Sequence, residues 1–107
     1  MQQISAEDLH QWLQDPAREK PLLLDVREPW EFERCHIEGS QLVPMREIPA
    51  RATMLDPGRQ TVVICHHGVR SAQVAMFLER SGFGNVINLH GGVAAWAQHV
   101  DPAMARY

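Results

Sequence analysis

The sequence predicts an α/β domain with a central, mostly parallel sheet of about five strands and helices on both faces. Two observations lead to this prediction. Short apolar runs alternate along the chain with segments of helical periodicity, which is the pattern of consecutive β–α–β units. The runs Leu22–Leu24 and Thr61–Ile64 also lack the polar alternation of half-exposed strands, as expected where a parallel sheet buries both of its faces.

The first elements are marked by the residues at their boundaries. Ser5 comes directly before a segment with helical spacing of apolar residues and is expected to cap that helix. Asp15–Pro16 ends the helix, because a residue that precedes proline disfavours the helical conformation. Pro29 stands at the first position of a second helix, where proline is favoured. Leu42–Val43 follows as a short strand.

The second half of the chain continues the alternation. Arg46–Met54 is expected to form a helix that is interrupted near Pro49. Ser71–Leu78 has the pattern of a further helix, and Val86–Leu89 that of the last strand. Gly91–Gly92 then breaks the chain before a final helix.

Length and composition are those of one globular domain over residues 1–107. Of the 107 residues, 45% are apolar and 21% are charged. The net charge of −3 provides no basic field for nucleic acid or for an anionic membrane. Two cysteines are too few for a disulfide scaffold and no signal segment is evident, so we expect a cytoplasmic protein with reduced thiols. Nothing in the pattern indicates an obligate assembly, and we expect a monomer.

Cys65 is the candidate nucleophile because of its place in the pattern. It follows the strand Thr61–Ile64, and ligands of parallel α/β sheets bind at the carboxyl ends of strands. A short loop before a helix turns backbone N–H groups inward, and the unpaired N–H groups of the first helical turn add partial positive charge. Such an anion site stabilises a cysteine thiolate. Position alone leaves open the alternative that Cys65 is a buried structural cysteine.

The residues after Cys65 are candidates for substrate binding. Gly68 permits a backbone angle that other residues disfavour, and the Arg70 guanidinium can bind an oxyanion through two N–H groups. The loop can then hold both an anionic sulfur donor and a persulfide on the cysteine. This chemistry needs neither a metal nor an organic cofactor, and we expect neither. The candidate binding residues are His66, His67, Gly68, Val69, Arg70 and Ser71.

Four motifs resemble those of the rhodanese family. In chain order they are Leu23–Glu28 with Glu31–Phe32, His36–Ser40, the loop that begins at Cys65, and Asn88–Gly92 with Ala95–Trp96. They extend over nearly the whole chain, whose length is similar to that of the stand-alone bacterial members. The resemblance implies a single rhodanese-like domain.

The resemblance also implies an activity, thiosulfate sulfurtransferase. Thiosulfate or a similar donor would transfer its sulfane sulfur to Cys65 as a persulfide. A nucleophile would then remove it: cyanide in the laboratory, and a thiol or a partner protein in the cell. By matching position, the residues from His66 to Ser71 would supply the binding loop. Asp25 and Arg27 are expected to form a buried pair that supports the loop from behind.

Cys35 departs from the family pattern, which usually has glycine at this position. A second thiol could resolve a disulfide with Cys65, or it could be a small residue that the fold tolerates. We favour the second interpretation, because separation along the chain gives no sign that the two thiols are close together.

Three other functions stay open. Cdc25-type phosphatases and arsenate reductases have a related fold, but their loop is one residue longer than the four residues between Cys65 and Arg70, and a tighter loop favours sulfur over a phosphoryl group. The second alternative is a non-catalytic regulatory module, or a persulfide carrier that serves one partner. A metal site built on Cys65, His66 and His67 is the third, although adjacent residues rarely converge on one ion.

Overall fold

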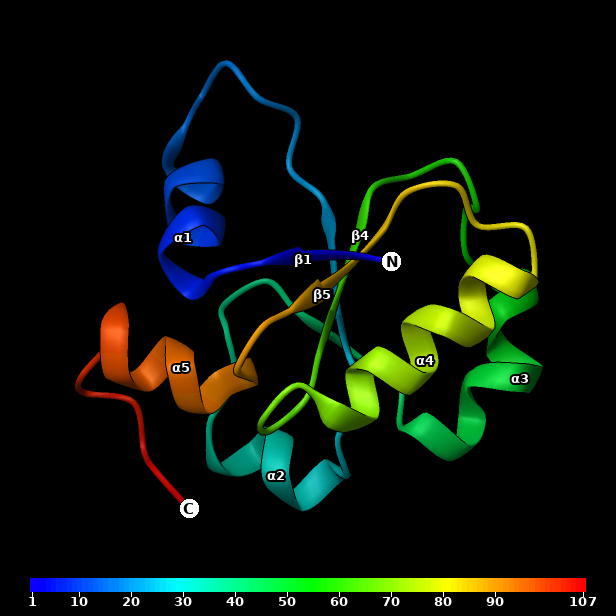
Figure 1. The fold of residues 1–107 in the computed structure, drawn as a ribbon. Helices are drawn as coiled ribbons and strands as arrows, with labels where there is room; N and C mark the ends of the chain where they lie inside the picture. The colour runs from blue at the N-terminus through cyan, green and yellow to red at the C-terminus, as the bar shows by residue number, and fades with distance from the viewer.

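The computed structural model describes all 107 residues and is organised around one five-stranded sheet (Figure 1). The strands are β1 (Gln2–Ile4), β2 (Leu22–Asp25), β3 (Gln41–Leu42), β4 (Thr61–Ile64) and β5 (Val86–Leu89). Their order across the sheet is β1-β5-β4-β2-β3, and every neighbouring pair is parallel. The predicted α/β fold class is therefore confirmed.

The helices lie on both faces of this sheet. They are α1 (Ala6–Gln14), α2 (Pro29–Arg34), α3 (Ile48–Arg51), α4 (Val69–Arg80) and α5 (Gly92–His99). α1 and α5 cover one face, α3 and α4 cover the other, and α2 lies near the start of α4 (Figure 1). None of the helices has the length and apolar character that crossing a bilayer requires.

The ends of the helices show where the local sequence pattern was sufficient to predict a helix boundary. Ser5 caps α1, with its hydroxyl accepting from the N–H of Asp8 at 3.1 Å. The predicted helix around Pro49 is broken into α3 and two flanking 3-10 turns. α4 begins at Val69, two residues before the predicted start at Ser71, because Gly68 takes up the N-cap position itself.

Cys65 continues the alternation of side-chain directions along β4. Val62 and Ile64 belong to the apolar cluster on the α1 and α5 side, whereas Val63 and Cys65 belong to the cluster under α4. Side chains along a strand point alternately to its two faces, so the residue that follows Ile64 must face α4. The strand thereby directs the thiol toward the start of the helix that comes next in the chain.

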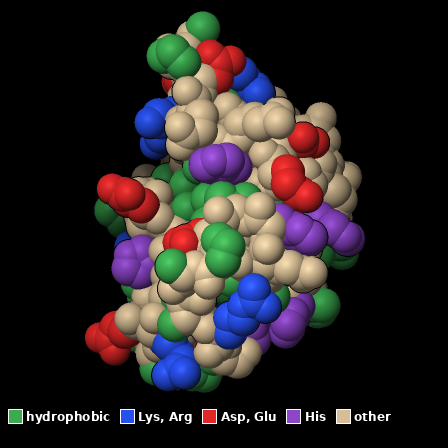
Figure 2. Space-filling view, turned by 90° about the vertical axis from the view of Figure 1, so that its left-hand side faces the viewer, with side chains coloured by type: hydrophobic (Ala, Val, Ile, Leu, Met, Phe, Trp, Pro, Cys, Tyr) green, Lys and Arg blue, Asp and Glu red, His purple; other side chains and the backbone are tan.

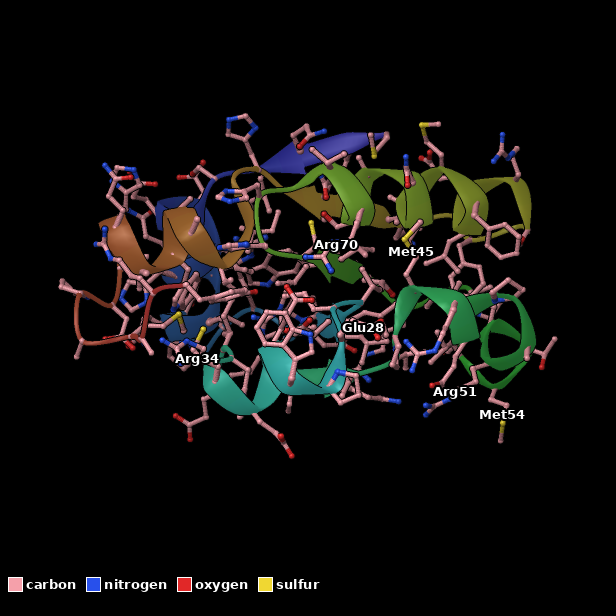
Figure 3. All side chains as sticks on the ribbon, turned by 90° about the horizontal axis from the view of Figure 1, so that it is seen from below. Glu28, Arg34, Met45, Arg51, Met54 and Arg70 are labelled. Atoms are coloured by element: carbon pink, nitrogen blue, oxygen red, sulfur yellow. The ribbon has the colours of Figure 1, made fainter.

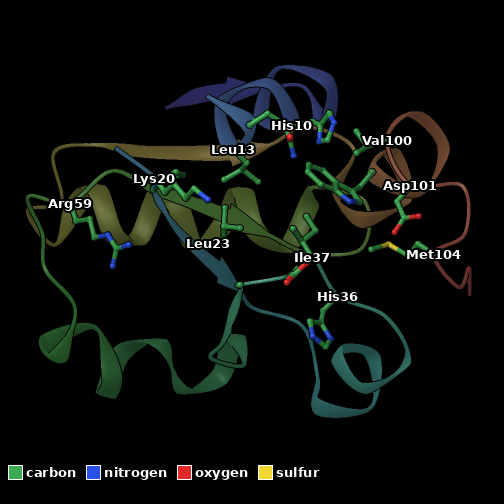
Figure 4. Close-up of a pocket in the computed structure, with 15 residues that line it drawn as sticks. His10, Leu13, Lys20, Leu23, His36, Ile37, Arg59, Val100, Asp101 and Met104 are labelled. Atoms are coloured by element: carbon green, nitrogen blue, oxygen red, sulfur yellow. The ribbon is translucent and has the colours of Figure 1, made fainter. Parts of the chain in front are cut away.

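A large cavity of the molecule lies away from Cys65. On the α1 and α5 side a cavity of about 810 Å³ is lined by His10, His36, Trp96 and Met104 among other residues (Figure 4). Figure 2 views this side of the molecule and shows apolar side chains at the floor of a hollow with histidines beside it. Cys65 does not line this cavity.

Candidate active site

The Cys65 thiol lies at the point where β4 ends and the turn into α4 begins. The residue is 1% exposed, yet its sulfur has polar neighbours. The backbone N–H of Gly68 donates to Sγ at 3.0 Å, and the Ser71 hydroxyl oxygen lies 3.2 Å from it. A cysteine with an amide and a hydroxyl directed at its sulfur is placed for chemistry as a thiolate, which a purely hydrocarbon pocket would oppose.

Asn88 on β5 gives the Ser71 hydroxyl a second acceptor besides the Cys65 sulfur. The Asn88 side-chain amide donates to Gln3 Oε1 at 3.0 Å and to the Gly68 carbonyl at 3.2 Å, so its own oxygen must face Ser71, at 2.5 Å. When Cys65 is a thiol, its hydrogen can point to Ser71 while Ser71 donates to Asn88. When Cys65 is a thiolate, the single hydroxyl hydrogen of Ser71 can turn to the sulfur.

The start of α5 holds the loop from the other side. The N–H groups of Val93 and Ala94 donate to the carbonyls of Cys65 and His66 at 2.9 and 3.1 Å. In a trans peptide the following N–H points opposite to the carbonyl, so the N–H groups of His66 and His67 are directed away from α5. Gly92 makes this contact possible, since a Cβ there would lie 2.3 Å from the Cys65 carbonyl oxygen.

Gly68 closes the turn. Its φ of 99° lies in the left-handed region, and a Cβ added there would come within 3.2 Å of the Gly91 nitrogen. Both the backbone angle and the close approach disfavour a side chain at this position. The predicted need for glycine in the loop thus has a geometric cause.

Arg70 is paired inside the protein. Its two Nη atoms donate to the two carboxylate oxygens of Glu31 on α2, at 2.8 and 2.9 Å. Figure 3 shows Arg70 extending from the start of α4 toward α2, which begins after Glu28. Hydrogen bonds with Glu31 are the largest cause of a raised pKa for Arg70, so its guanidinium stays charged.

Glu31 is held by four hydrogen bonds. Besides the two from Arg70, it accepts from the Tyr107 hydroxyl at 2.8 Å and from the backbone N–H of Glu28 at 2.9 Å. The hydrogen bonds with Arg70 are the largest cause of a pKa lowered to about 2. Its carboxylate is therefore ionised at any pH near neutrality.

Asp25 and Arg27 form the expected buried pair, both fully inaccessible to solvent. Arg27 binds the Asp25 carboxylate through Nε and Nη2, with the shortest contact at 2.7 Å. Its remaining N–H groups donate to the carbonyls of Glu31 and Cys35 and to the Tyr107 hydroxyl. The pair therefore braces α2, and with it Glu31, and makes no hydrogen bond to Cys65.

Tyr107 joins the chain end to this network. After α5 the chain turns back toward α2 (Figure 1), and the Tyr107 ring stacks on His66 with 3.9 Å between ring centroids. Burial raises the pKa of Tyr107 to about 12, which keeps its hydroxyl protonated as the donor to Glu31. Burial also lowers the pKa of His66, and the neighbouring His67 contributes, so the stacked imidazole is uncharged near neutral pH.

The predicted residues are brought together unequally. Gly68 and Ser71 contact the Cys65 sulfur and Arg70 lies in the first turn of α4, whereas Val69 is 68% exposed. His66 and His67 stack on each other beside a second cavity, of about 170 Å³. Cys35 is a free, half-buried cysteine whose sulfur lies 3.9 Å from Arg27 Nη1.

Three residues of this site were missed from the sequence: Glu31 as a partner of Arg70, Asn88 and Tyr107. Asn88 carried a signal, because an asparagine inside an otherwise apolar buried strand must find hydrogen-bond partners. Glu31 belongs to the first of the four rhodanese-like motifs, but nothing in the sequence indicated which residue it contacts. No feature of the pattern marked Tyr107. The structure also brings no three His, Cys, Asp or Glu side chains together as a metal site.

Fold and site together define a class of protein: a parallel α/β domain that holds a cysteine sulfur against the turn between a strand and a helix. A sequence model of the rhodanese-like domain matches residues 5–99, and the chain belongs to this family. A crystal structure of a rhodanese-like domain protein from Staphylococcus aureus superposes with a TM-score of 0.82 at 30% identity, covering 90% of this chain and 91% of that one.

Curated relatives extend the comparison. The chain is 39% identical over 103 residues to a sulfurtransferase from Allochromatium vinosum, covering 96% of this chain and 94% of the relative. It is 32% identical over 82 residues to the thiosulfate sulfurtransferase GlpE of Stutzerimonas stutzeri, covering 77% and 74%. Three other matching relatives are longer, and the chain spans only 26% to 36% of their length. The named relatives support sulfur transfer as the general activity.

Proposed function

We propose that this protein is a sulfurtransferase that carries a sulfane sulfur on Cys65 as a persulfide, taking it from thiosulfate or a similar donor and passing it to a thiophilic acceptor. One observation carries the proposal: the sulfur of Cys65 accepts from the Gly68 N–H at 3.0 Å and lies 3.2 Å from the Ser71 hydroxyl. Both groups stabilise negative charge on the sulfur, whether it is the thiolate or the inner atom of a persulfide.

The reaction has two steps. The Cys65 thiolate attacks the sulfane sulfur of thiosulfate, a bond forms between the two sulfurs, and sulfite leaves with the electron pair of the broken S–S bond. The acceptor then attacks the terminal sulfur of the persulfide, and the thiolate leaves with its electron pair. With cyanide the product is thiocyanate, and with a thiol it is a new persulfide. No external oxidant or reductant is consumed.

The remaining loop residues have supporting roles in this proposal. The backbone N–H groups of His66, His67 and Gly68 face away from α5 or toward the sulfur and would bind the incoming sulfur donor and the persulfide. Val69, exposed at the rim, would contact the sulfur donor or a partner protein. Arg70 and Ser71 would set the charge and the hydrogen bonding around the reacting sulfur.

The test is turnover of thiosulfate with cyanide, measured as thiocyanate. Cys65→Ser should lower kcat by at least about 10³-fold, because a hydroxyl cannot replace the thiolate nucleophile. Cys35→Ser is the matched control and should keep turnover, since its sulfur has Arg27 as its hydrogen-bond neighbour and makes no hydrogen bond to the loop. A phosphatase substrate, assayed in parallel, tests the related enzyme class. Turnover by Cys65→Ser at the wild-type rate would rule out the persulfide mechanism.

A further inference from the structure

The guanidinium of Arg70, in the first turn of α4, is already neutralised. Both Nη atoms of Arg70 are engaged by Glu31, whose side chain is 5% exposed. Glu31 also accepts from Tyr107 and from the Glu28 backbone, so four donors hold the carboxylate in this position. An anionic sulfur donor that approaches Cys65 therefore meets a guanidinium and a carboxylate together.

Two other arginines around the site are also paired with carboxylates. Arg27 is paired with Asp25 and Arg46 with Glu28. Arg106 donates to the Ala97 carbonyl and lines the 170 Å³ cavity, which does not include Cys65. The groups that the structure directs at the sulfur itself are the Gly68 N–H and the Ser71 hydroxyl, at the start of α4, which provide partial charges only.

Partial charges of this kind can balance one negative charge more easily than two. Thiosulfate is a dianion with a large hydration free energy, and the Glu31 carboxylate repels each of its charges. A persulfide anion, R–S–S⁻, or a thiosulfonate, R–SO₂–S⁻, brings a single charge and the same reactive terminal sulfur. The electrostatics of the site therefore discriminate between sulfur donors by charge.

We propose that the Glu31–Arg70 pair makes Cys65 selective for sulfane donors with a single negative charge over dianions, a specificity that rests on the sulfurtransferase function proposed above. Glu31 acts here as a specificity-determining residue. It cancels the charge that Arg70 would otherwise offer to a second anionic oxygen.

A matched pair of sulfur donors isolates this effect. Methanethiosulfonate differs from thiosulfate by a methyl group in place of one anionic oxygen. In each case the thiolate attacks the terminal sulfur, the S–S bond breaks, and methanesulfinate or sulfite leaves with the electron pair. The different reactivities of the two donors cancel when the ratio of their kcat/KM values is compared between protein variants.

The experiment measures kcat/KM for both sulfur donors, with cyanide as acceptor at low ionic strength, in the wild type, Glu31→Gln and Glu33→Gln. Glutamine keeps a hydrogen bond to Arg70 and removes one negative charge. Because Coulomb energy scales with charge, kcat/KM should rise about tenfold for thiosulfate and about threefold for methanethiosulfonate in Glu31→Gln. Glu33, exposed on the same helix, is the control and should leave the ratio unchanged.

The wild type supplies a second measurement in case Glu31→Gln folds poorly. With Arg70 neutralised, kcat/KM for thiosulfate should depend little on added salt, whereas a free guanidinium would make it fall steeply. An unchanged donor ratio in folded Glu31→Gln, or a steep salt dependence in the wild type, would overturn the proposed specificity alone. Absence of turnover with either sulfur donor would instead overturn the sulfurtransferase function, and the specificity with it.

Discussion

Glu31 illustrates at the scale of one residue how a buried charge is kept. Its carboxylate is removed from water but accepts four hydrogen bonds, two of them from a guanidinium. The pKa of Glu31 falls from 4.5 to about 2 in the folded protein. A carboxyl whose folded-state pKa is lowered stabilises the fold above its unfolded-state pKa, and this stabilisation is lost as the pH falls toward the folded-state value.

Acid unfolding should therefore show a contribution from Glu31. We expect Glu31→Gln to be less stable than the wild type near pH 7 by roughly 3–4 kcal/mol, since each tenfold change in acid dissociation is worth about 1.4 kcal/mol. The difference should shrink between pH 4.5 and about 2, where Glu31 becomes protonated. Urea unfolding at several pH values measures it. A difference that stays constant over this range would show that Glu31 is not held as an ion by the fold.

Residue-scale contacts also set the limit of what the sequence could predict. The proximity of Cys65, Gly68 and Ser71 was predictable because it depends on a short loop whose geometry is local. The Glu31–Arg70 pair spans 39 residues and the Glu31–Tyr107 contact spans 76, and one sequence carries no information about such pairing. The Arg70 guanidinium was expected to bind an oxyanion of the substrate. In the structure it binds the carboxylate of Glu31 instead.

At the scale of elements, local rules placed most of the fold. Buried strands were marked by apolar runs, and helix ends by Ser5, Pro29 and the glycines. β1 was missed because its three residues, two of them exposed glutamines, lie at the edge of the sheet and show no apolar run. The start of α4 was placed too late because a glycine N-cap in the left-handed region leaves no capping side chain in the sequence.

The contact between α5 and the cysteine loop gives an element-scale prediction. Gly92 has a φ of 58°, and a Cβ there would meet the carbonyl oxygens of Cys65 and His66 at 2.3 and 2.5 Å. Gly92→Ala should lower the free energy of unfolding by roughly 2–4 kcal/mol, from backbone strain and overpacking. It should also reduce sulfur transfer, because the loop carbonyls lose the N–H groups of Val93 and Ala94.

Gly84→Ala is the matched control for this change. Gly84 is outside the left-handed region, and a Cβ there would meet nothing within 4 Å. Urea unfolding midpoints and thiocyanate production of the two variants are compared with those of the wild type. Equal stability and turnover of Gly92→Ala and Gly84→Ala would contradict the role assigned to the α5 contact.

At the scale of the whole molecule, the parallel sheet gathers the site. The carboxyl ends of neighbouring parallel strands meet at one edge, so the segments after β2, β4 and β5 supply Arg27, Cys65 and Gly92 to the same region. This convergence was predictable from the fold class. The contribution of the chain end could not be predicted in this way. Residues 100–107 follow the part of the chain that matches the family and are fixed only by tertiary contacts.

The central claim is that Cys65 carries a sulfur atom, and intact mass spectrometry tests it most directly. The protein is incubated with excess thiosulfate or methanethiosulfonate, freed of small molecules and weighed. We expect a mass gain of one sulfur atom that cyanide removes and that Cys65→Ser does not show. No gain with either sulfur donor, or an equal gain in Cys65→Ser, would contradict the account.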